Sequence, residues 1–180
     1  MTNKQSRREF LIKAVGGLVT LVGYNALNAD DYVPKERTSL SPNYTDHNGD
    51  RSIDKIILHT TESAGKNAEN SFLNPNSKVS AHYIIMEDGE IVKMVDEEDI
   101  AWHCRGHNKK SIGIEIAGYY NKKINNDQVK SVAYLIKRAE ANYRLTDACI
   151  KAHSELDPAR RKDPGKENME AILKALKRKQ

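Results

Sequence analysis

The sequence predicts an α/β fold: a single domain with a central mixed β-sheet covered by helices. Two observations support this prediction. Short apolar runs of strand length alternate along the chain with segments of helical periodicity. An Asp-Gly pair between two of the apolar runs is a strong signal for a β-hairpin. The resulting order of strand, short helix, hairpin, strand, helix, strand and helix suggests one sheet with helices packed on it, and 180 residues suit one such domain.

The strands are expected where apolar runs are short. The run Ile56-Ile57-Leu58 indicates a buried strand, and Asp88-Gly89 stands at the turn of the hairpin. Between Ser111 and Ala117, isoleucines alternate with Gly113 and Glu115, which predicts a strand with the isoleucines on one face. In chain order, the expected strands cover residues 53–59, 80–86, 91–95, 111–117 and 148–153.

Helices are expected where the apolar period lengthens. The clearest has an apolar face from Val129 to Tyr143 and is preceded by Asn125, Asn126 and Asp127, which are candidates for its N-cap. A short helix is expected over 66–73, and apolar residues at helical spacing over 169–176 predict a final amphipathic helix.

The first 29 residues are expected to be a signal peptide. Four basic residues, among them the pair Arg7-Arg8, precede an apolar run of 14 residues that ends at Leu27, and the small residue Ala29 suits cleavage. Such a run is too short to span a membrane. Because residues 6–11 resemble the twin-arginine export motif, we expect export to the periplasm with no stable membrane anchor. The alternative is an amphipathic N-terminal helix, which the glycines in the run disfavour.

The charge of the chain gives no support to nucleic-acid binding. The whole chain has 29 Lys and Arg against 25 Asp and Glu, a net charge of +4. Without residues 1–29, it keeps 25 basic and 24 acidic residues, a net charge of +1. A nearly neutral chain lacks the excess of basic residues that is typical of nucleic-acid binding. We therefore expect no nucleic-acid partner, and the sequence does not indicate an oligomeric state.

Two histidines at strand ends are candidates for metal binding. The sequence contains no Gly-rich phosphate loop and no nucleophile elbow. His59 and His153 end predicted strands, and Asp163 follows His153 by ten residues. Two imidazoles and a carboxylate can form a catalytic zinc site with an open fourth position. Considered alone, however, a histidine at a strand end is more often a capping or core residue.

Three charged residues are candidates for the chemistry itself. Glu115 lies opposite the isoleucine face of its strand and is either a solvated residue or a general base beside a metal-activated water. Arg161 and Lys162 directly precede Asp163. They either stabilise an oxyanion or are surface charges.

Eight short blocks of sequence run in one order from about residue 41 to the last helix. They are residues 41–44, 56–61, 79–85, 88–89, 101–103, 111–115, 152–154 and 162–165. In this order they closely resemble the zinc-dependent N-acetylmuramoyl-L-alanine amidases of the AmpD-like type, which share a fold with peptidoglycan recognition proteins. The domains implied are a signal peptide over 1–29, an extended lead-in over 30–52 and a zinc amidase domain over 53–180.

The resemblance implies a metal set and a reaction. It assigns His59, His153 and Asp163 as Zn²⁺ ligands and Glu115 as the catalytic carboxylate. The implied reaction is hydrolysis of the amide bond between N-acetylmuramic acid and L-alanine of the stem peptide, in peptidoglycan or muropeptides. Glu115 would take a proton from water and return it to the leaving amine.

The resemblance also implies an oxyanion group and a substrate cleft. A basic residue normally stands two positions before the aspartate ligand; here it is Arg161, where relatives usually have lysine, and Lys162 adjoins the ligand. Both cations therefore stay candidates for oxyanion stabilisation. The residues expected at the substrate cleft are Asn43, Tyr44, His82, Trp102 and His103; of these, His82, Trp102 and His103 are expected either to form the cleft wall or to support the metal ligands from behind.

Two other functions are compatible with parts of the sequence. A non-catalytic peptidoglycan-binding protein of the same fold is disfavoured because all three ligands and Glu115 are present. A cysteine hydrolase that uses Cys104 is disfavoured because no cysteine-nucleophile signature surrounds this residue. Cys104 and Cys149 can alternatively pair in an oxidising compartment, which the sequence leaves open.

Overall fold

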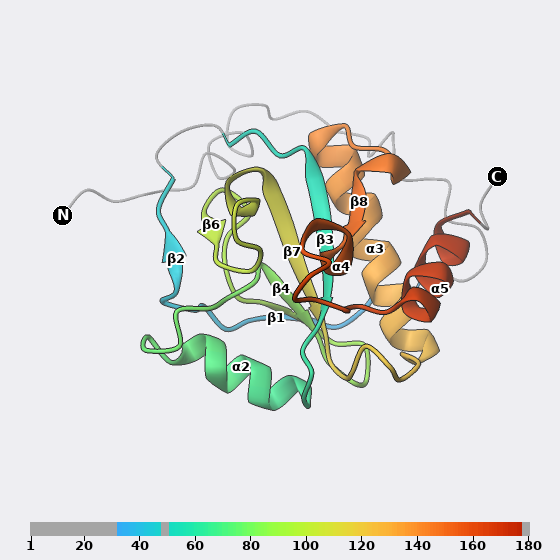
Figure 1. Cartoon of the computed structure of the whole chain (residues 1–180), viewed down its shortest axis with the longest axis horizontal. Helices are drawn as coiled ribbons and strands as arrows, with labels where there is room; N and C mark the ends of the chain where they lie inside the picture. Colours follow the sequence, from blue (N-terminus) through green and yellow to red (C-terminus); the bar gives the residue numbers. More distant parts are fainter. Residues whose placement is uncertain (1–31, 48–50, 178–180) are drawn as a thin grey trace, which may run out of the picture. The chain divides into compact units, whose positions relative to one another are not determined.

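A six-stranded β-sheet forms the centre of the computed structural model, which describes residues 32–47 and 51–177 (Figure 1). Its strands are β1 Glu36–Thr38, β3 Lys55–Thr60, β4 Tyr83–Ile85, β5 Ile91–Lys93, β7 Ser111–Ile116 and β8 Ile150–Ala152. They lie in the order β1-β5-β4-β7-β3-β8. β7 pairs in parallel with β3 and β4, and β8 pairs in parallel with β3, whereas the β4–β5 hairpin is antiparallel. The sheet is therefore mixed, as predicted.

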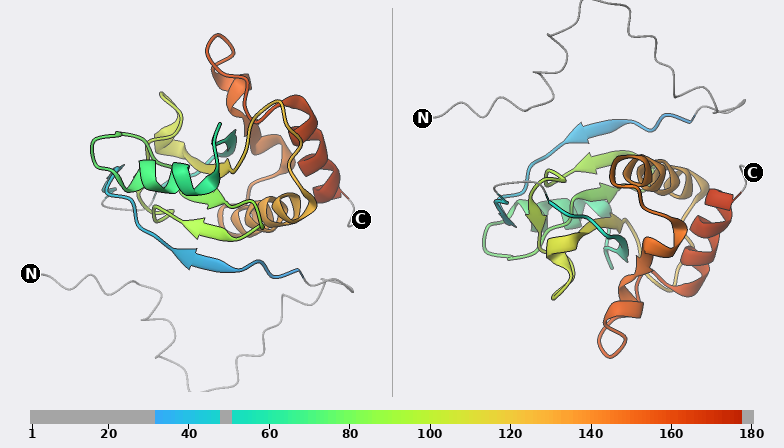
Figure 2. Two further views of the ribbon diagram at one scale, coloured as in Figure 1. Left: turned by 90° about the horizontal axis from the view of Figure 1, so that it is seen from below. Right: turned by 90° about the horizontal axis from the view of Figure 1, so that it is seen from above.

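Helices cover both faces of this sheet (Figure 2). They are α2 Gly65–Leu73, α3 Asn126–Tyr143, α4 His153–Leu156 and α5 Lys166–Lys177, with 3₁₀ turns η1 Asn108–Lys110 and η2 Asp147–Cys149. α3 and α5 pack on each other and on one face, while α2 packs on the other. The predicted cap of α3 is present as a capping box, in which Asn125 and Gln128 each accept a hydrogen bond from the other's backbone N–H.

The isoleucine face of β7 forms the centre of the larger core. Ile112, Ile114 and Ile116 are almost fully buried and belong to one cluster with Leu135 and Ile136 of α3. Burying one such side chain contributes about 1.5–3 kcal/mol to stability. The predicted alternation is therefore confirmed, and it directs Gly113 and Glu115 to the opposite face.

The last predicted strand is shorter than expected. Residues 147–149 form the turn η2, β8 covers only 150–152, and His153 is already the first residue of α4. The Glu155 side chain accepts a hydrogen bond from the backbone N–H of Ala152 at 3.1 Å, which favours the start of a helix at this point. His153 therefore leaves the sheet at the point where the strand ends.

Part of the segment expected as an extended lead-in pairs with the rest of the fold. β1 adds a parallel edge strand beside β5, and the ribbon of β2 Tyr44–Thr45 with β6 Ile100–Ala101 forms a second, two-stranded sheet. Sequence reasoning missed these strands because they are short and carry no apolar alternation. Arg37 holds β1 in place through ion pairs with Glu69 of α2 and Glu90, at 2.6 and 2.8 Å.

Two further features concern the predicted signal peptide and membranes. The predicted signal peptide, residues 1–29, lies outside the residues that the structure describes. Within the described ranges, no helix has the length and apolar character needed to cross a membrane.

Candidate metal centre

Three neighbouring parallel strands, β7, β3 and β8, end at the same edge of the sheet, and the predicted ligands gather there. His59 is the next-to-last residue of β3, and the register places it beside Glu115 of β7. His153 directly follows β8. Asp163 lies in the loop before α5, and its carbonyl accepts a hydrogen bond from Ser154 N at 3.0 Å. The carboxyl ends of parallel strands are a common location for functional sites.

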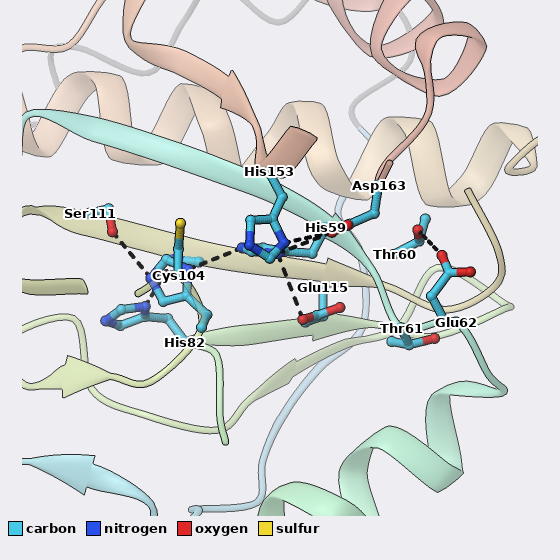
Figure 3. Close-up of polar contacts among 12 residues, drawn as sticks. His59, Thr60, Thr61, Glu62, His82, Cys104, Ser111, Glu115, His153 and Asp163 are labelled. Carbon is cyan, nitrogen blue, oxygen red and sulfur yellow. Dashed lines mark hydrogen bonds and ion pairs between the residues drawn. The ribbon is translucent and has the colours of Figure 1, made fainter. Parts of the chain in front are cut away.

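The donor atoms of the three predicted ligands point toward one another (Figure 3). Nδ1 of His59 lies 2.9 Å from Nδ1 of His153 and 3.3 Å from Oδ2 of Asp163, and the last two atoms are 3.0 Å apart. All three residues are buried. Zinc bonds of about 2.0–2.1 Å in a tetrahedron separate the donors by about 3.3 Å. The spacing and the chemistry of the donor set therefore fit a zinc ion.

The protonation of the cluster suits a metal ion as well. Burial lowers the pKa of His59 to about 4, so the imidazole is neutral at pH 7. Burial by itself would raise the pKa of Asp163, but the contacts of its carboxylate with the His153 and His59 imidazoles outweigh it and hold this pKa below its usual range. Neutral imidazole and ionised carboxylate are the forms that bind a metal.

Glu115 lies beside this cluster with one oxygen unpartnered. Its Oε1 is 4.0 Å from Nδ1 of His59, and its Oε2 is buried without a hydrogen-bond partner in the described part of the chain. Burial, and then the negative charge of Asp163, raise the pKa of Glu115 well above its usual value. A buried, unsatisfied polar group costs about 1–3 kcal/mol and more when charged. A carboxylate kept in this state beside a donor cluster indicates a functional group.

The amino-acid pattern of one protein family, described as N-acetylmuramoyl-L-alanine amidase, matches residues 49–166. The chain belongs to this family. It is 42% identical over 79 residues to N-acetylmuramoyl-L-alanine amidase A of Achromobacter lyticus, a match that covers 43% of this chain and 44% of that protein. It is 32% identical over 96 residues to 1,6-anhydro-N-acetylmuramyl-L-alanine amidase AmpD of Salmonella typhimurium, covering 49% and 51%. The chain thus spans about half the length of the curated relatives it matches.

A solved structure of AmpD extends the similarity over most of this chain. The crystal structure of a selenomethionine derivative of AmpD superposes with a TM-score of 0.69 at 25% sequence identity. The match covers 81% of this chain and 96% of the AmpD chain. The predicted fold class is confirmed by this similarity and by the mixed, helix-covered sheet.

The two cations that precede Asp163 have different surroundings in this amidase family member. Both side chains are exposed. The positive charge of Arg161 counteracts the burial that raises the pKa of Glu115, so Arg161 lies close enough to act on the site. The ammonium nitrogen of Lys162 lies over the ring of Tyr120, 5.8 Å from its centroid. Both residues stay candidates for the oxyanion group, and of the two only the charge of Arg161 acts on the pKa of Glu115.

Two of the five residues predicted at the substrate cleft are buried inside the domain. His82 is fully buried, and its Nδ1 accepts a hydrogen bond from Gly113 N at 3.0 Å. Asn43 is buried too, and its side-chain amide donates to the carbonyls of Phe72 and Asn74 at 2.9 and 2.8 Å. Both side chains make hydrogen bonds inside the domain, which leaves them no surface for a substrate.

The other three predicted substrate contacts lie at the surface or beside the site. Tyr44 is exposed on β2, and the indole Nε1 of Trp102 donates to Thr45 Oγ1 at 2.9 Å, which fixes the ring on the β2–β6 ribbon. Substrate binding by Tyr44 and Trp102 stays a prediction. His103 is partly exposed, and its Nδ1 lies 3.0 Å from Nε2 of His59, so its direct contact is with a predicted metal ligand.

Sequence reasoning missed Arg51, which organises the loops around β6. Its guanidinium donates to the carbonyls of Glu97, Asp99 and Asn108 at 2.7, 2.6 and 2.7 Å. Burial lowers the pKa of Arg51 to about 10, so the group still carries its charge at neutral pH. The sequence offers no local motif for this role, since Arg51 stands in a polar, turn-rich segment.

The two cysteines do not support a cysteine hydrolase. Cys104 and Cys149 are both free. Cys104 is buried, and burial raises the pKa of its thiol. A nucleophilic cysteine needs a lowered pKa, because the thiolate is the reactive form.

Proposed function

We propose that the protein is a zinc-dependent amidase that hydrolyses the bond between N-acetylmuramic acid and L-alanine of the stem peptide, in peptidoglycan or muropeptides. The observation that carries this proposal is the buried cluster of His59, His153 and Asp163 with the unpartnered Glu115 oxygen beside it. Membership of the N-acetylmuramoyl-L-alanine amidase family supports the choice of this amide bond.

His59, His153 and Asp163 would hold the zinc ion. When bound, zinc supplies a Lewis acid that activates water and polarises the amide carbonyl. The three donors come from β3, from the start of α4 and from the loop before α5, so the packed domain determines their spacing. Three protein ligands leave a fourth position open, as catalytic zinc sites require.

Glu115 would move the protons. It accepts one from the attacking water and returns it to the nitrogen of L-alanine as the amide bond breaks. Its Oε2 is available for this because no other group of the described chain bonds to it. Burial raises the pKa of Glu115, which makes the carboxylate a stronger base than a solvated glutamate.

Arg161 would stabilise the negative charge that develops on the carbonyl oxygen. Its charge already acts on Glu115, and its side chain is exposed, so it can turn toward a bound substrate. The aromatic rings of Tyr44 and Trp102 are proposed to pack on the sugar or peptide.

Product analysis with defined muropeptides tests this proposal. The wild type should release free stem peptide, detected by mass spectrometry, and lose this activity when a chelator removes zinc. His153→Ala should lose both bound zinc and activity, whereas His47→Ala, a histidine outside the donor cluster, should keep both. Peptide release that persists without zinc would contradict the proposal. Zinc-loaded protein that binds sacculi yet frees no peptide would instead identify a binding protein.

We also propose that residues 1–29 direct export through the twin-arginine pathway to the periplasm, where peptidoglycan lies. The paired arginines at positions 7 and 8 support this. Cell fractionation tests it: replacing both arginines with lysine should leave the protein in the cytoplasm. An unchanged distribution of this variant would exclude the twin-arginine route.

A further inference from the structure

A chain of hydrogen bonds leads away from the metal cluster through His103. The imidazole of His59 directs Nδ1 at the other donors, and its Nε2 lies 3.0 Å from Nδ1 of His103. Nε2 of His103 is 3.1 Å from Ser111 Oγ, which donates to the backbone carbonyl of His107 at 2.9 Å. Figure 3 labels His59 and Ser111, the two side chains that this path connects.

The last acceptor in this series of hydrogen bonds, the His107 carbonyl, determines which atom is the donor in each of the others. A backbone carbonyl only accepts, so Ser111 must donate its hydroxyl proton to His107. Its oxygen is then free to accept the Nε2–H of His103, which leaves Nδ1 of His103 without a proton. That nitrogen accepts the Nε2–H of His59. Nδ1 of His59 is therefore unprotonated, and its lone pair faces the other two donors.

We infer that His103 and Ser111 are positioning residues that hold His59 in the tautomer and orientation needed to bind the metal through Nδ1. The inference rests on the zinc site of the proposed function. A metal-bound imidazole is commonly fixed by a hydrogen bond at its other nitrogen, which also makes the ligand more basic. Here a second imidazole and a hydroxyl perform this role, in place of the more usual carboxylate.

The backbone of the domain is shaped to receive the His103 ring. A Cβ atom built on Gly113 of β7 would lie 2.4 Å from Cγ of His103, so only glycine leaves room for the ring against the strand. The loop is held as well, because the backbone N–H groups of His103 and Cys104 both donate to Asn108 Oδ1, at 3.1 and 2.7 Å. The position of the His103 ring is thus determined by the strand that packs against it at Gly113 and by the hydrogen bonds that hold the His103 backbone.

Zinc affinity, measured by competition with a chelator of known affinity, tests the inference without reference to turnover. Loss of such a supporting partner typically weakens metal binding by about 10–100-fold, and we expect this for His103→Ala. Ser111→Ala should give a smaller loss, because it removes only the group that orients His103. The control His47→Ala should bind zinc like the wild type.

Two further measurements separate positioning from general structural support. His103→Asn places an amide oxygen near the position of Nδ1 and should recover most of the affinity that His103→Ala loses, because it still accepts from His59. Long-range ¹H–¹⁵N spectra of the metal-free protein should show His59 as the Nε2–H tautomer, and His103→Ala should convert it to a mixture of tautomers.

Several results would overturn the inference. Wild-type zinc affinity in a folded His103→Ala would do so, as would equal losses in His103→Asn and His103→Ala, or a His59 tautomer that does not respond. If His103→Ala fails to fold, Ser111→Ala decides between the same outcomes. A wild-type protein that binds zinc but releases no stem peptide would refute the proposed reaction while leaving the positioning inference intact.

Discussion

The two faces of strands β3 and β7 have opposite properties. On one face, Ile112, Ile114 and Ile116 are buried under α3 and belong to the larger core. On the other face, one residue along, Gly113 leaves room for an imidazole and Glu115 keeps an unpartnered oxygen. Alternate residues of β7 therefore have different roles. The isoleucines stabilise the domain, whereas Gly113 and Glu115 form part of the site at a cost in stability.

The largest expected effect is on the functional face. Glu115→Gln should reduce turnover by about 100–10,000-fold, since it removes the general base, while zinc binding is retained. It should also leave the free energy of unfolding unchanged or raise it, because a neutral amide replaces a buried, unpartnered carboxylate. Steady-state kinetics, metal analysis and urea unfolding measure the three quantities. Near-normal turnover would assign the base elsewhere.

The matched change on the core face should lower stability and leave turnover and zinc binding largely unchanged. Ile114→Ala, one residue before Glu115, opens a cavity in the core and should lower the free energy of unfolding by about 2–5 kcal/mol. Below its unfolding transition, the variant should retain most of its turnover and zinc. If Ile114→Ala loses zinc while still folded, the two faces are not independent.

The third prediction compares Arg161 with Lys162, the two exposed cations that precede Asp163. Arg161→Ala should lower turnover by about 10–100-fold, somewhat less than the loss of a preorganised oxyanion donor, because the side chain is exposed. Lys162→Ala should change turnover little, since its ammonium lies over the Tyr120 ring. Neither change should alter the unfolding transition. The reverse order of effects would make Lys162 the oxyanion group.

The smallest expected effect concerns the pH dependence of stability through Glu69 of α2, the helix on the face of the sheet that carries Glu115. Hydrogen bonds from Arg37 hold the pKa of Glu69 at about 2 instead of 4.5. A lowered carboxyl pKa contributes stability above pH 4.5 that is lost as the pH falls toward 2. Because Arg37 is partly exposed, we expect about 1–2 kcal/mol. Unfolding measured across this pH range should show a flatter decline in Glu69→Gln than in the wild type.

Most of the fold could be predicted from local patterns. The alternation over 111–117 identified both the core face of β7 and Glu115, and the Asp-Gly pair identified the β4–β5 hairpin. β1, β2 and β6 could not be predicted in this way, because strands of two or three residues are too short to show a period. β1 depends instead on partners distant in sequence, as the Arg37–Glu69 pair illustrates.

The donor cluster was predictable from the sequence, and its surroundings were less so. His59 and His153 converge because the neighbouring parallel strands β3 and β8 end together, which the strand order implies once the sheet is known, and the loop before α5 brings Asp163 to them. The burial of His82 and Asn43 could not be foreseen, because a sequence does not distinguish a polar residue that faces a cleft from one that is hydrogen-bonded inside the domain. That distinction depends on packing between distant segments.

The hydrogen bond between Ser154 N and Asp163 O has a consequence for how the site can vary. It closes the segment 153–163 into a loop whose two ends carry metal donors and are fastened to each other. The residues between these ends, apart from Arg161, can therefore change in composition while His153 and Asp163 stay close together. Exchanging these residues would give the proposed metal site a different rim, and with it a different preference for substrate.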